Sequence, residues 1–199
     1  METVTKTPVL IFGGGFNPPT LAHQEIMRAC LELPNFTELW VMPSGDRFDK
    51  QMNVDDCDRL EMLNLIKRYE FSDNSRLNIS DFELHLPRPT QTHKTVSALE
   101  SLYIDIDFWF IFGTDSYQNM PRWDKGLELQ TSLNMVIVER SNTELPQREG
   151  IITLRLNDCN GLSSTEARIA IRNGRPLDSF VCQSVKRYIE ERNLYQSMA

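Results

Sequence analysis

The chain has few histidines and cysteines, and their positions do not form a metal-binding pattern. Among 199 residues there are 3 histidines and 4 cysteines. The cysteines, Cys30, Cys57, Cys159 and Cys182, contain no CxxC pair and do not have the spacing of zinc ligands. We therefore expect no metal held by protein ligands alone, and reduced thiols in a cytoplasmic protein.

Long apolar runs and surplus positive charge are absent as well. No segment approaches the ~20 apolar residues of a membrane-spanning helix, and the N-terminal apolar run is too short for a secretory signal. The 21 lysines and arginines are outnumbered by 28 acidic residues, which gives a net charge of −7. This balance argues against a membrane surface or nucleic acid as a partner. It leaves room for a small phosphate pocket built from backbone amides and a few cations.

Short β-type runs alternate with amphipathic helical patterns along the chain. Helical patterns cover residues 21–33, 55–69, 95–102, 164–172 and 179–192, and the apolar runs typical of buried strands are Val9–Phe12, Leu39–Met42, Leu77–Ile79, Phe108–Phe112, Met135–Val138 and Ile151–Leu156. This alternation predicts a single α/β domain over residues 1–199, with a Rossmann-like, doubly wound, mainly parallel sheet, helices on both faces and a helical C-terminus. Ligands bind such sheets beyond the carboxyl ends of the strands, so the segments after the strands are candidate sites.

The first of these segments runs from Gly13 to His23 and reads GGGFNPPTLAH. It fits neither the dinucleotide GxGxxG spacing, because Pro18 stands where the last glycine is needed, nor a P-loop, because no Gly-Lys pair occurs in the chain. Thr20 stands at a predicted helix N-cap, and His23 falls on the same face of the first turn. A hydroxyl, an imidazole and backbone amides at the positive end of a helix are the components of a polyphosphate site.

A second candidate anion site reads LSSTEAR, from Leu162 to Arg168. Ser163 and Glu166 form a capping-box pattern, which needs no ligand to explain it. The other polar residues add two hydroxyls and a guanidinium at the same helix N-terminus, and arginine can clamp phosphate oxygens with two hydrogen bonds. Taken alone, this segment is compatible with a helix cap or with a phosphate site.

Together the two segments resemble the signatures GxF(D/N)Px(H/T)xGH and (I/L)SSTxxR of the (H/T)xGH nucleotidyltransferase superfamily, with Ala22 in place of a glycine. Over most of its length the chain is similar to the nicotinate/nicotinamide mononucleotide adenylyltransferase family. Residues 110–116 resemble that family's Gly-x-Asp motif, and Trp123 takes the place of a tryptophan that stacks on the pyridine ring. Lys94 departs from the tyrosine of many bacterial members.

This resemblance implies an adenylyltransferase that joins ATP and nicotinate mononucleotide to give deamido-NAD and pyrophosphate in NAD biosynthesis. Mg²⁺ would arrive with ATP, and homo-oligomers are frequent in the superfamily. The implied catalytic residues are His23, Thr20 and Arg168. The implied mononucleotide-binding residues are Lys50, Thr95 and Trp123. The implied ATP-binding residues are Gly14, Gly15, Phe16, Asn17, Thr20, His23, Gly113, Asp115, Ser163, Ser164, Thr165 and Arg168.

Three alternatives stay open on the sequence alone. The enzyme could use nicotinamide mononucleotide as well, because Asn17 and Thr20 resemble the versions in dual-specificity members. Phosphopantetheine adenylyltransferases and cytidylyltransferases share the first signature, although the former give no reason for Trp123. Ala22 leaves open a regulatory module that binds nucleotide without chemistry.

Overall fold

One sheet of parallel strands organises the molecule. The computed structural model describes residues 6–45, 52–139, 148–156 and 163–196. Within these ranges the strands pair side by side in the order β3-β2-β1-β4-β5-β6, all parallel. This is the doubly wound order, in which the strand order reverses between β1 and β4, so the predicted fold class is confirmed. The strands are β1 (Thr7–Gly14), β2 (Glu38–Pro43), β3 (Leu77–Ile79), β4 (Ile106–Gly113), β5 (Met135–Glu139) and β6 (Ile151–Arg155).

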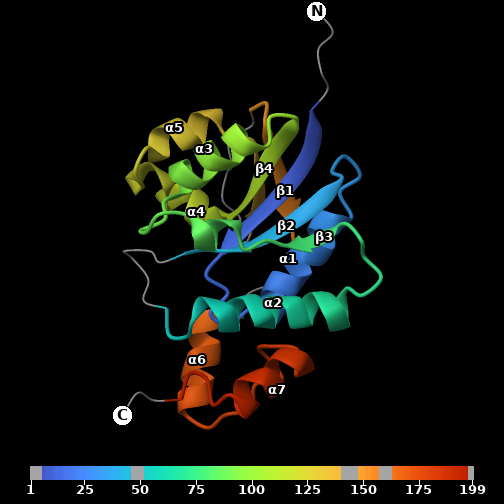
Figure 1. The fold of residues 1–199 in the computed structure, drawn as a ribbon, viewed down its shortest axis with the longest axis vertical. Coiled ribbons are helices and arrows are strands. Elements are labelled where there is room, and N and C mark those ends of the chain that lie inside the picture. Colours follow the sequence, from blue (N-terminus) through green and yellow to red (C-terminus); the bar gives the residue numbers. More distant parts are fainter. Residues whose placement is uncertain (1–5, 46–51, 140–147, 157–162, 197–199) are drawn as a thin grey trace, which may run out of the picture.

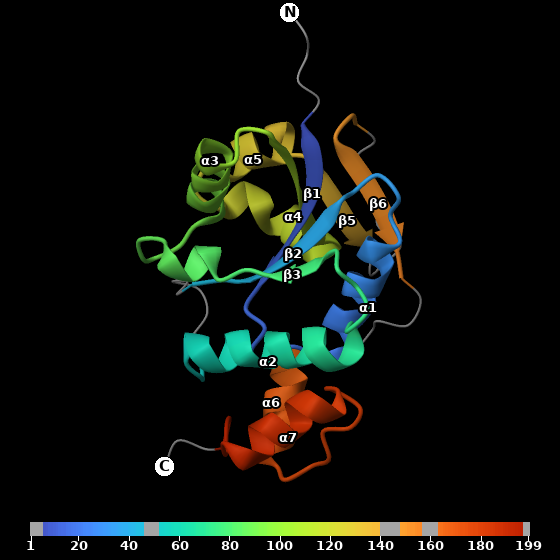
Figure 2. The same cartoon turned by 45° about the vertical axis from the view of Figure 1, so that its right-hand side comes forward.

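Helices cover both faces of the sheet (Figures 1 and 2). One face carries α1 (Leu21–Leu31) and α2 (Asp56–Glu70), and α2 lies between the sheet and the C-terminal pair α6 (Ser164–Arg172) and α7 (Gln183–Glu191). The opposite face carries α3 (Thr92–Leu102), α4 (Thr114–Asn119) and α5 (Gly126–Ser132), with the 3-10 turns η1 (Phe82–His85) and η2 (Met120–Arg122). No helix in the described ranges is long and apolar enough to cross a membrane.

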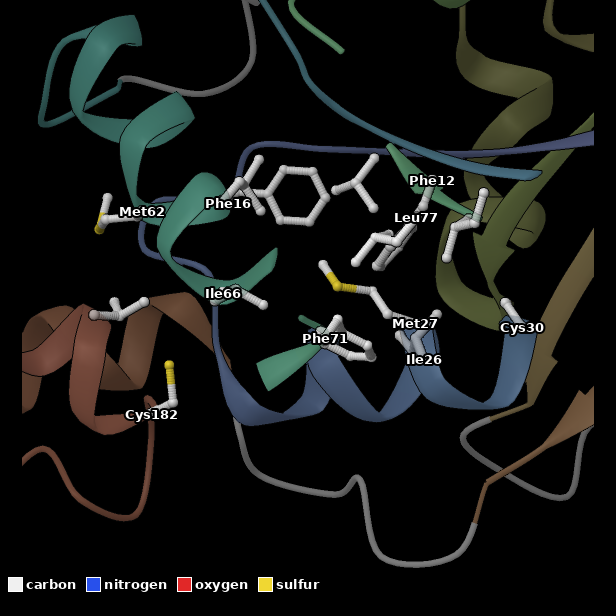
Figure 3. Packing of buried hydrophobic residues seen from close by; sticks show 14 of the residues in the cluster. Phe12, Phe16, Ile26, Met27, Cys30, Met62, Ile66, Phe71, Leu77 and Cys182 are labelled. Carbon is white, nitrogen blue, oxygen red and sulfur yellow. The ribbon is translucent and has the colours of Figure 1, made fainter. Parts of the chain in front are cut away.

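The sequence of β1 explains why helices pack against both faces of the sheet. Val9 and Ile11 belong to the core under α3 and α5, whereas Leu10 and Phe12 belong to the core under α1 and α2. Successive strand residues point to opposite faces, so an all-apolar run buries both. In the α1–α2 core, Phe16 projects toward Phe12, their ring centroids 5.4 Å apart (Figure 3). The first residues of the candidate loop are thus anchored in the core.

Several helix boundaries differ from the predicted ones. Helix α3 begins at Thr92 rather than at 95, and α7 begins at Gln183 rather than at 179, after turns that precede its N-cap at Cys182. Helices α4 and α5 were not predicted, because they are short and rich in polar residues with weak helical periodicity. Their positions after β4 and η2 matter, since α4 begins at the edge of the candidate site.

Candidate active site

Two adjoining cavities open at the carboxyl ends of β1 and β4, where the strand order reverses. The larger has a volume of about 650 Å³ and the smaller about 350 Å³. Both are lined by Gly13 and Gly14 from the end of β1, by Ile111 and Phe112 from β4, and by Ser116 from α4. A ligand in one cavity would therefore lie directly beside a ligand in the other.

The larger cavity collects the two signature segments. Its wall includes every predicted ATP-binding residue except Thr20: Gly14, Gly15, Phe16, Asn17, His23, Gly113, Asp115, Ser163, Ser164, Thr165 and Arg168. The N-terminus of α6 faces the loop after β1 and the first turn of α1 across this space. Helix N-termini present backbone N–H groups and positive partial charge, so the cavity suits a polyanion.

His23 is held in one orientation by the residue that begins its helix. The backbone N–H of Thr20 donates to Nδ1 of His23 at 2.9 Å, and the Thr20 hydroxyl oxygen lies 2.9 Å from the same nitrogen. Because Nδ1 accepts from a backbone donor, the neutral ring carries its hydrogen on Nε2. The ring of Phe16 packs beside it, the two centroids 5.0 Å apart. His23 is therefore presented to the cavity as a hydrogen-bond donor.

Thr20, a predicted catalytic and ATP-binding residue, lies at the N-cap of α1. Its side chain is fully buried and does not contribute to the wall of either cavity. The reason is local: at the N-cap position its backbone and hydroxyl are directed at the His23 ring. Thr20 thus holds the His23 ring in position through its contacts with Nδ1. Ala22 is also buried and contributes to neither cavity wall.

Side chains of α6 form hydrogen bonds with the loop that follows β1, although the two segments lie far apart in the sequence. Nη1 of Arg168 donates to the Asn17 carbonyl at 2.6 Å, and the Ser164 hydroxyl donates to the Pro18 carbonyl at 2.8 Å. Nη2 of Arg168 also donates to the Thr165 hydroxyl at 3.2 Å. Burial lowers the pKa of the Arg168 guanidinium from its ordinary value, and the positive charge of Arg172 acts in the same direction. An anion in the cavity would relieve that cost by pairing with the guanidinium.

The sequence did not single out three side chains near these signatures. Arg172 lies one helical turn beyond Arg168 and lines the larger cavity, and so do Met52 and Asn53. The Asn17 amide nitrogen lies 3.5 Å from the Asn53 side-chain oxygen, while the Asn17 side-chain oxygen is buried without a partner among the residues the structure describes. The spacing of four residues on a helix could have indicated Arg172. Nothing local to residues 52 and 53 indicates their role.

The buried side chain of Arg59 contacts the backbone of the loop that follows β1. Arg59 of α2 has no exposed side-chain surface, donates from Nη1 to the Gly15 carbonyl at 2.9 Å and pairs with Asp56 at 2.5 Å. Asp56 also pairs with Arg88, which is 45% exposed. Arg59 thus fixes the backbone of the loop that follows β1 to α2.

Replacing Arg59 with methionine is expected to lower the free energy of unfolding by about 2 kcal/mol, because the Gly15 carbonyl loses a charged donor and Asp56 keeps only Arg88 as its partner. Chemical denaturation measures this. Arg88→Met is the matched control, and it should cost less than about 1 kcal/mol because its side chain is half exposed. Equal losses for the two variants would contradict the supporting role of Arg59.

The smaller cavity brings together two of the predicted mononucleotide residues. Trp123 and Thr95 both line it. The Trp123 ring meets Phe112 edge to face, with centroids 5.9 Å apart and an interplanar angle of 62°. Thr95 is buried, and its hydroxyl donates to the Gln91 carbonyl at 3.4 Å. The third predicted residue, Lys50, lies outside the described residues. The wall also contains Ser44, Glu83, Thr90, Gln91, Thr92 and Asp124.

Comparisons with known proteins agree with this geometry. A cytidylyltransferase-like family model matches residues 11–170. The probable nicotinate-nucleotide adenylyltransferase of Methylacidiphilum infernorum is 30% identical over 199 residues, covering 98% of this chain and 95% of that protein. The chain belongs to the cytidylyltransferase-like family, among the nicotinate-nucleotide adenylyltransferases. The predicted family is thereby confirmed. The nicotinate-nucleotide adenylyltransferase of Bacillus subtilis is 29% identical over 189 residues, covering 94% of this chain and 97% of that protein.

Solved structures of nicotinate-nucleotide adenylyltransferases share the fold. The Plasmodium falciparum nicotinic acid mononucleotide adenylyltransferase in complex with NaAD superposes with a TM-score of 0.83 at 23% identity, covering 95% of this chain and 97% of that chain. The same protein in complex with APC gives a TM-score of 0.82. At this identity the likeness establishes the fold, including the strand-order reversal at which both cavities open.

Proposed function

We propose that the chain is a nicotinate-nucleotide adenylyltransferase of NAD biosynthesis, which joins ATP and nicotinate mononucleotide to give deamido-NAD and pyrophosphate. The observation that carries the proposal is the contact between two cavities of different character. One is walled by both nucleotidyltransferase signatures, and the other by Trp123 and Thr95. The names of the full-length relatives support the same activity.

The reaction needs no nucleophile from the protein. The 5′-phosphate of the mononucleotide is ionised and attacks the α-phosphorus of ATP, so that a new P–O bond forms as the bond to the β-phosphate oxygen breaks and pyrophosphate leaves. Catalysis of such a transfer consists of positioning the two phosphates and stabilising the charge that spreads onto their oxygens. The shared wall at Gly13 and Gly14 is where the two phosphates would meet.

We assign the roles from the contacts of each residue. His23 donates from Nε2 to an α- or β-phosphate oxygen, and Thr20 keeps its ring in that orientation. Arg168 and Thr165 hold the leaving pyrophosphate through their side chains, and Ser164, whose hydroxyl donates to the Pro18 carbonyl, does so through its backbone N–H at the start of α6. The tie from Arg168 to the Asn17 carbonyl keeps the guanidinium close to the first loop. Asp115 holds the nucleotide from the start of α4, as the resemblance implied.

We propose that Mg²⁺ enters with ATP, held by phosphate oxygens and water, and neutralises part of the phosphate charge. The donor set fits this arrangement. Within the described ranges no three potential ligands gather into a metal site, and Asp115 is the carboxylate that lines the larger cavity there. Among the described residues of this wall, Asp115 is the one that could offer a carboxylate oxygen to the cation.

A pyrophosphate-release assay with ATP and a panel of acceptors tests the proposed activity. The panel contains nicotinate mononucleotide, nicotinamide mononucleotide and 4′-phosphopantetheine, each with and without the protein. We expect release with nicotinate mononucleotide and identification of deamido-NAD as the second product. Release with 4′-phosphopantetheine alone would favour the other adenylyltransferase, and binding of ATP without release with any acceptor would favour a regulatory module.

Trp123→Ala is expected to raise KM for nicotinate mononucleotide roughly 3- to 10-fold, because an aromatic stacking contact contributes about 0.5–1.5 kcal/mol beyond burial. KM for ATP should stay within about twofold, since Trp123 lines the smaller cavity and not the larger one. Steady-state kinetics with each substrate varied in turn measures both. Trp123→Phe is the control that keeps a ring and should restore most of the affinity, whereas a parallel rise in both KM values would contradict the assignment.

A further inference from the structure

The backbone of the loop that follows β1 is strained at Phe16. The φ angle of this residue is +43°, in the left-handed region that bulky side chains seldom allow. Such a conformation costs free energy and persists only where the surrounding structure enforces it. The Phe16 ring is 1% exposed and packs against Phe12 in the core, which anchors the side chain. The peptide between Gly15 and Phe16 needs a holding contact of its own.

Arg59 supplies that contact from outside the larger cavity. Its Nη1 donates to the Gly15 carbonyl at 2.9 Å, and its side chain is fully buried. Gly15 and Phe16 line the larger cavity, whereas Arg59 does not. The peptide between Gly15 and Phe16 is trans, and in a planar trans peptide the C=O and N–H groups point in opposite directions. Because the Gly15 carbonyl is directed at Arg59, the Phe16 N–H is directed to the opposite side of the loop, toward the cavity.

The Arg59 guanidinium is oriented in turn by Asp56, three residues earlier in α2. Nη2 of Arg59 donates to Oδ1 of Asp56 at 2.5 Å, and the other carboxylate oxygen of Asp56 accepts from Arg88. Nε of Arg59 is buried and has no partner among the residues that the structure describes. The guanidinium is a rigid plane, so fixing Nη2 at Asp56 also fixes the direction in which Nη1 points. Within the described ranges, Asp56 is thus the side chain that aims Arg59 at the Gly15 carbonyl.

We propose that Asp56 is a positioning residue for ATP: it orients Arg59, which turns the peptide between Gly15 and Phe16 so that the Phe16 N–H donates to a phosphate oxygen. This inference rests on the proposed function. A backbone N–H that is aimed in advance at a phosphate stabilises negative charge without reorganising during the reaction. Asp56 lines neither cavity, so it acts through Arg59 and not on a substrate. Its loss is therefore felt at ATP and not at the mononucleotide.

Asp56→Asn keeps the shape of the side chain and removes its charge, which weakens the hydrogen bond that orients Arg59. We expect kcat/KM for ATP to fall about 5- to 10-fold, the effect of one weakened hydrogen bond. KM for nicotinate mononucleotide should change less than twofold. Asp55→Asn is the matched control, because it removes a carboxylate from the same end of α2, and the Asp55 side chain is exposed and makes no capping hydrogen bond. It should keep kcat/KM for ATP within about twofold, and equal losses in the two variants would overturn the proposal.

A double-mutant cycle separates positioning from a general loss of stability. Arg59→Met should lower kcat/KM for ATP at least as much as Asp56→Asn does. In the Arg59→Met background, Asp56→Asn should lower it by less than a further twofold, because both variants break the same series of contacts. Each rate is measured at a temperature at which circular dichroism shows the variant to be folded. An undiminished effect of Asp56→Asn in the absence of Arg59 would show that Asp56 acts by another route and would overturn the proposal.

Calorimetric titration with ATP alone tests the positioning role without any acceptor, and it decides the question even if the Arg59→Met protein does not fold. The Asp56→Asn protein should bind ATP about 5- to 10-fold more weakly than the wild-type and Asp55→Asn proteins do. Equal ATP affinity in all three proteins, with normal turnover, would overturn the role of Asp56 and leave the proposed function intact. Weaker ATP binding by Asp56→Asn, in a protein that converts no pyridine mononucleotide, would support the positioning role and overturn the proposed function.

Discussion

Replacing His23 with alanine is expected to lower kcat about 10²-fold or more, by analogy with the loss of one preorganised donor to a developing negative charge. The donor is preorganised because Thr20 fixes the ring through Nδ1, 2.9 Å from its backbone nitrogen. The side chain is half-buried at the cavity wall, so the fold should survive its loss. Steady-state turnover of ATP and nicotinate mononucleotide measures the effect.

His85→Ala is the matched control for the removal of a histidine. His85 lies in η1, where its Nε2 is 3.0 Å from Asp81, and it lines neither cavity. Its variant should keep turnover within about twofold, and both variants should show the circular dichroism spectrum of the wild-type protein. Near-normal kcat in the His23→Ala protein would remove His23 from the catalytic set.

Arg168→Ala is expected to raise KM for ATP roughly 10- to 100-fold, because a hydrogen bond to a charged group contributes about 1.5–3 kcal/mol. The affinity for nicotinate mononucleotide should fall less than about threefold, since Arg168 lines the larger cavity and not the smaller one. Separate titrations with each nucleotide measure the two affinities. Equal losses would contradict a role at the ATP phosphates.

Two further variants, one at Arg168 and one at Arg172, separate the effect of positive charge on ATP binding from the effect of hydrogen-bond geometry. Arg168→Lys keeps the charge but cannot both donate to the Asn17 carbonyl and clamp a phosphate with paired N–H groups, so it should recover only part of the ATP affinity. Arg172→Ala removes the cation one turn further along α6, at an exposed position of the same cavity. It should weaken ATP binding less than Arg168→Ala does.

The fold was predictable from the sequence because its strands contain short apolar runs that are separated by helical patterns. The β1 run buries alternate residues on both faces, and this pattern is what a parallel, doubly wound sheet requires. Helices α4 and α5 were missed because a short polar helix leaves little periodicity to detect.

The site residues that belong to a contiguous sequence motif were predictable. Contacts between segments that lie far apart in the sequence were not. The signatures indicated His23 and Arg168, but they did not indicate that Arg168 would donate a hydrogen bond to the Asn17 carbonyl, 151 residues away. The motif indicated Thr20 but not that its backbone and hydroxyl would contact the His23 ring.

Nicotinate mononucleotide is the proposed acceptor of the adenylyl group, and its direct comparison with nicotinamide mononucleotide tests this assignment. The ratio of kcat/KM for nicotinate mononucleotide to kcat/KM for nicotinamide mononucleotide should be measured at saturating ATP with the same protein. We expect a ratio well above one, with deamido-NAD as the product. A ratio below one, or dinucleotide formation from neither mononucleotide, would contradict the assignment as a nicotinate-nucleotide adenylyltransferase.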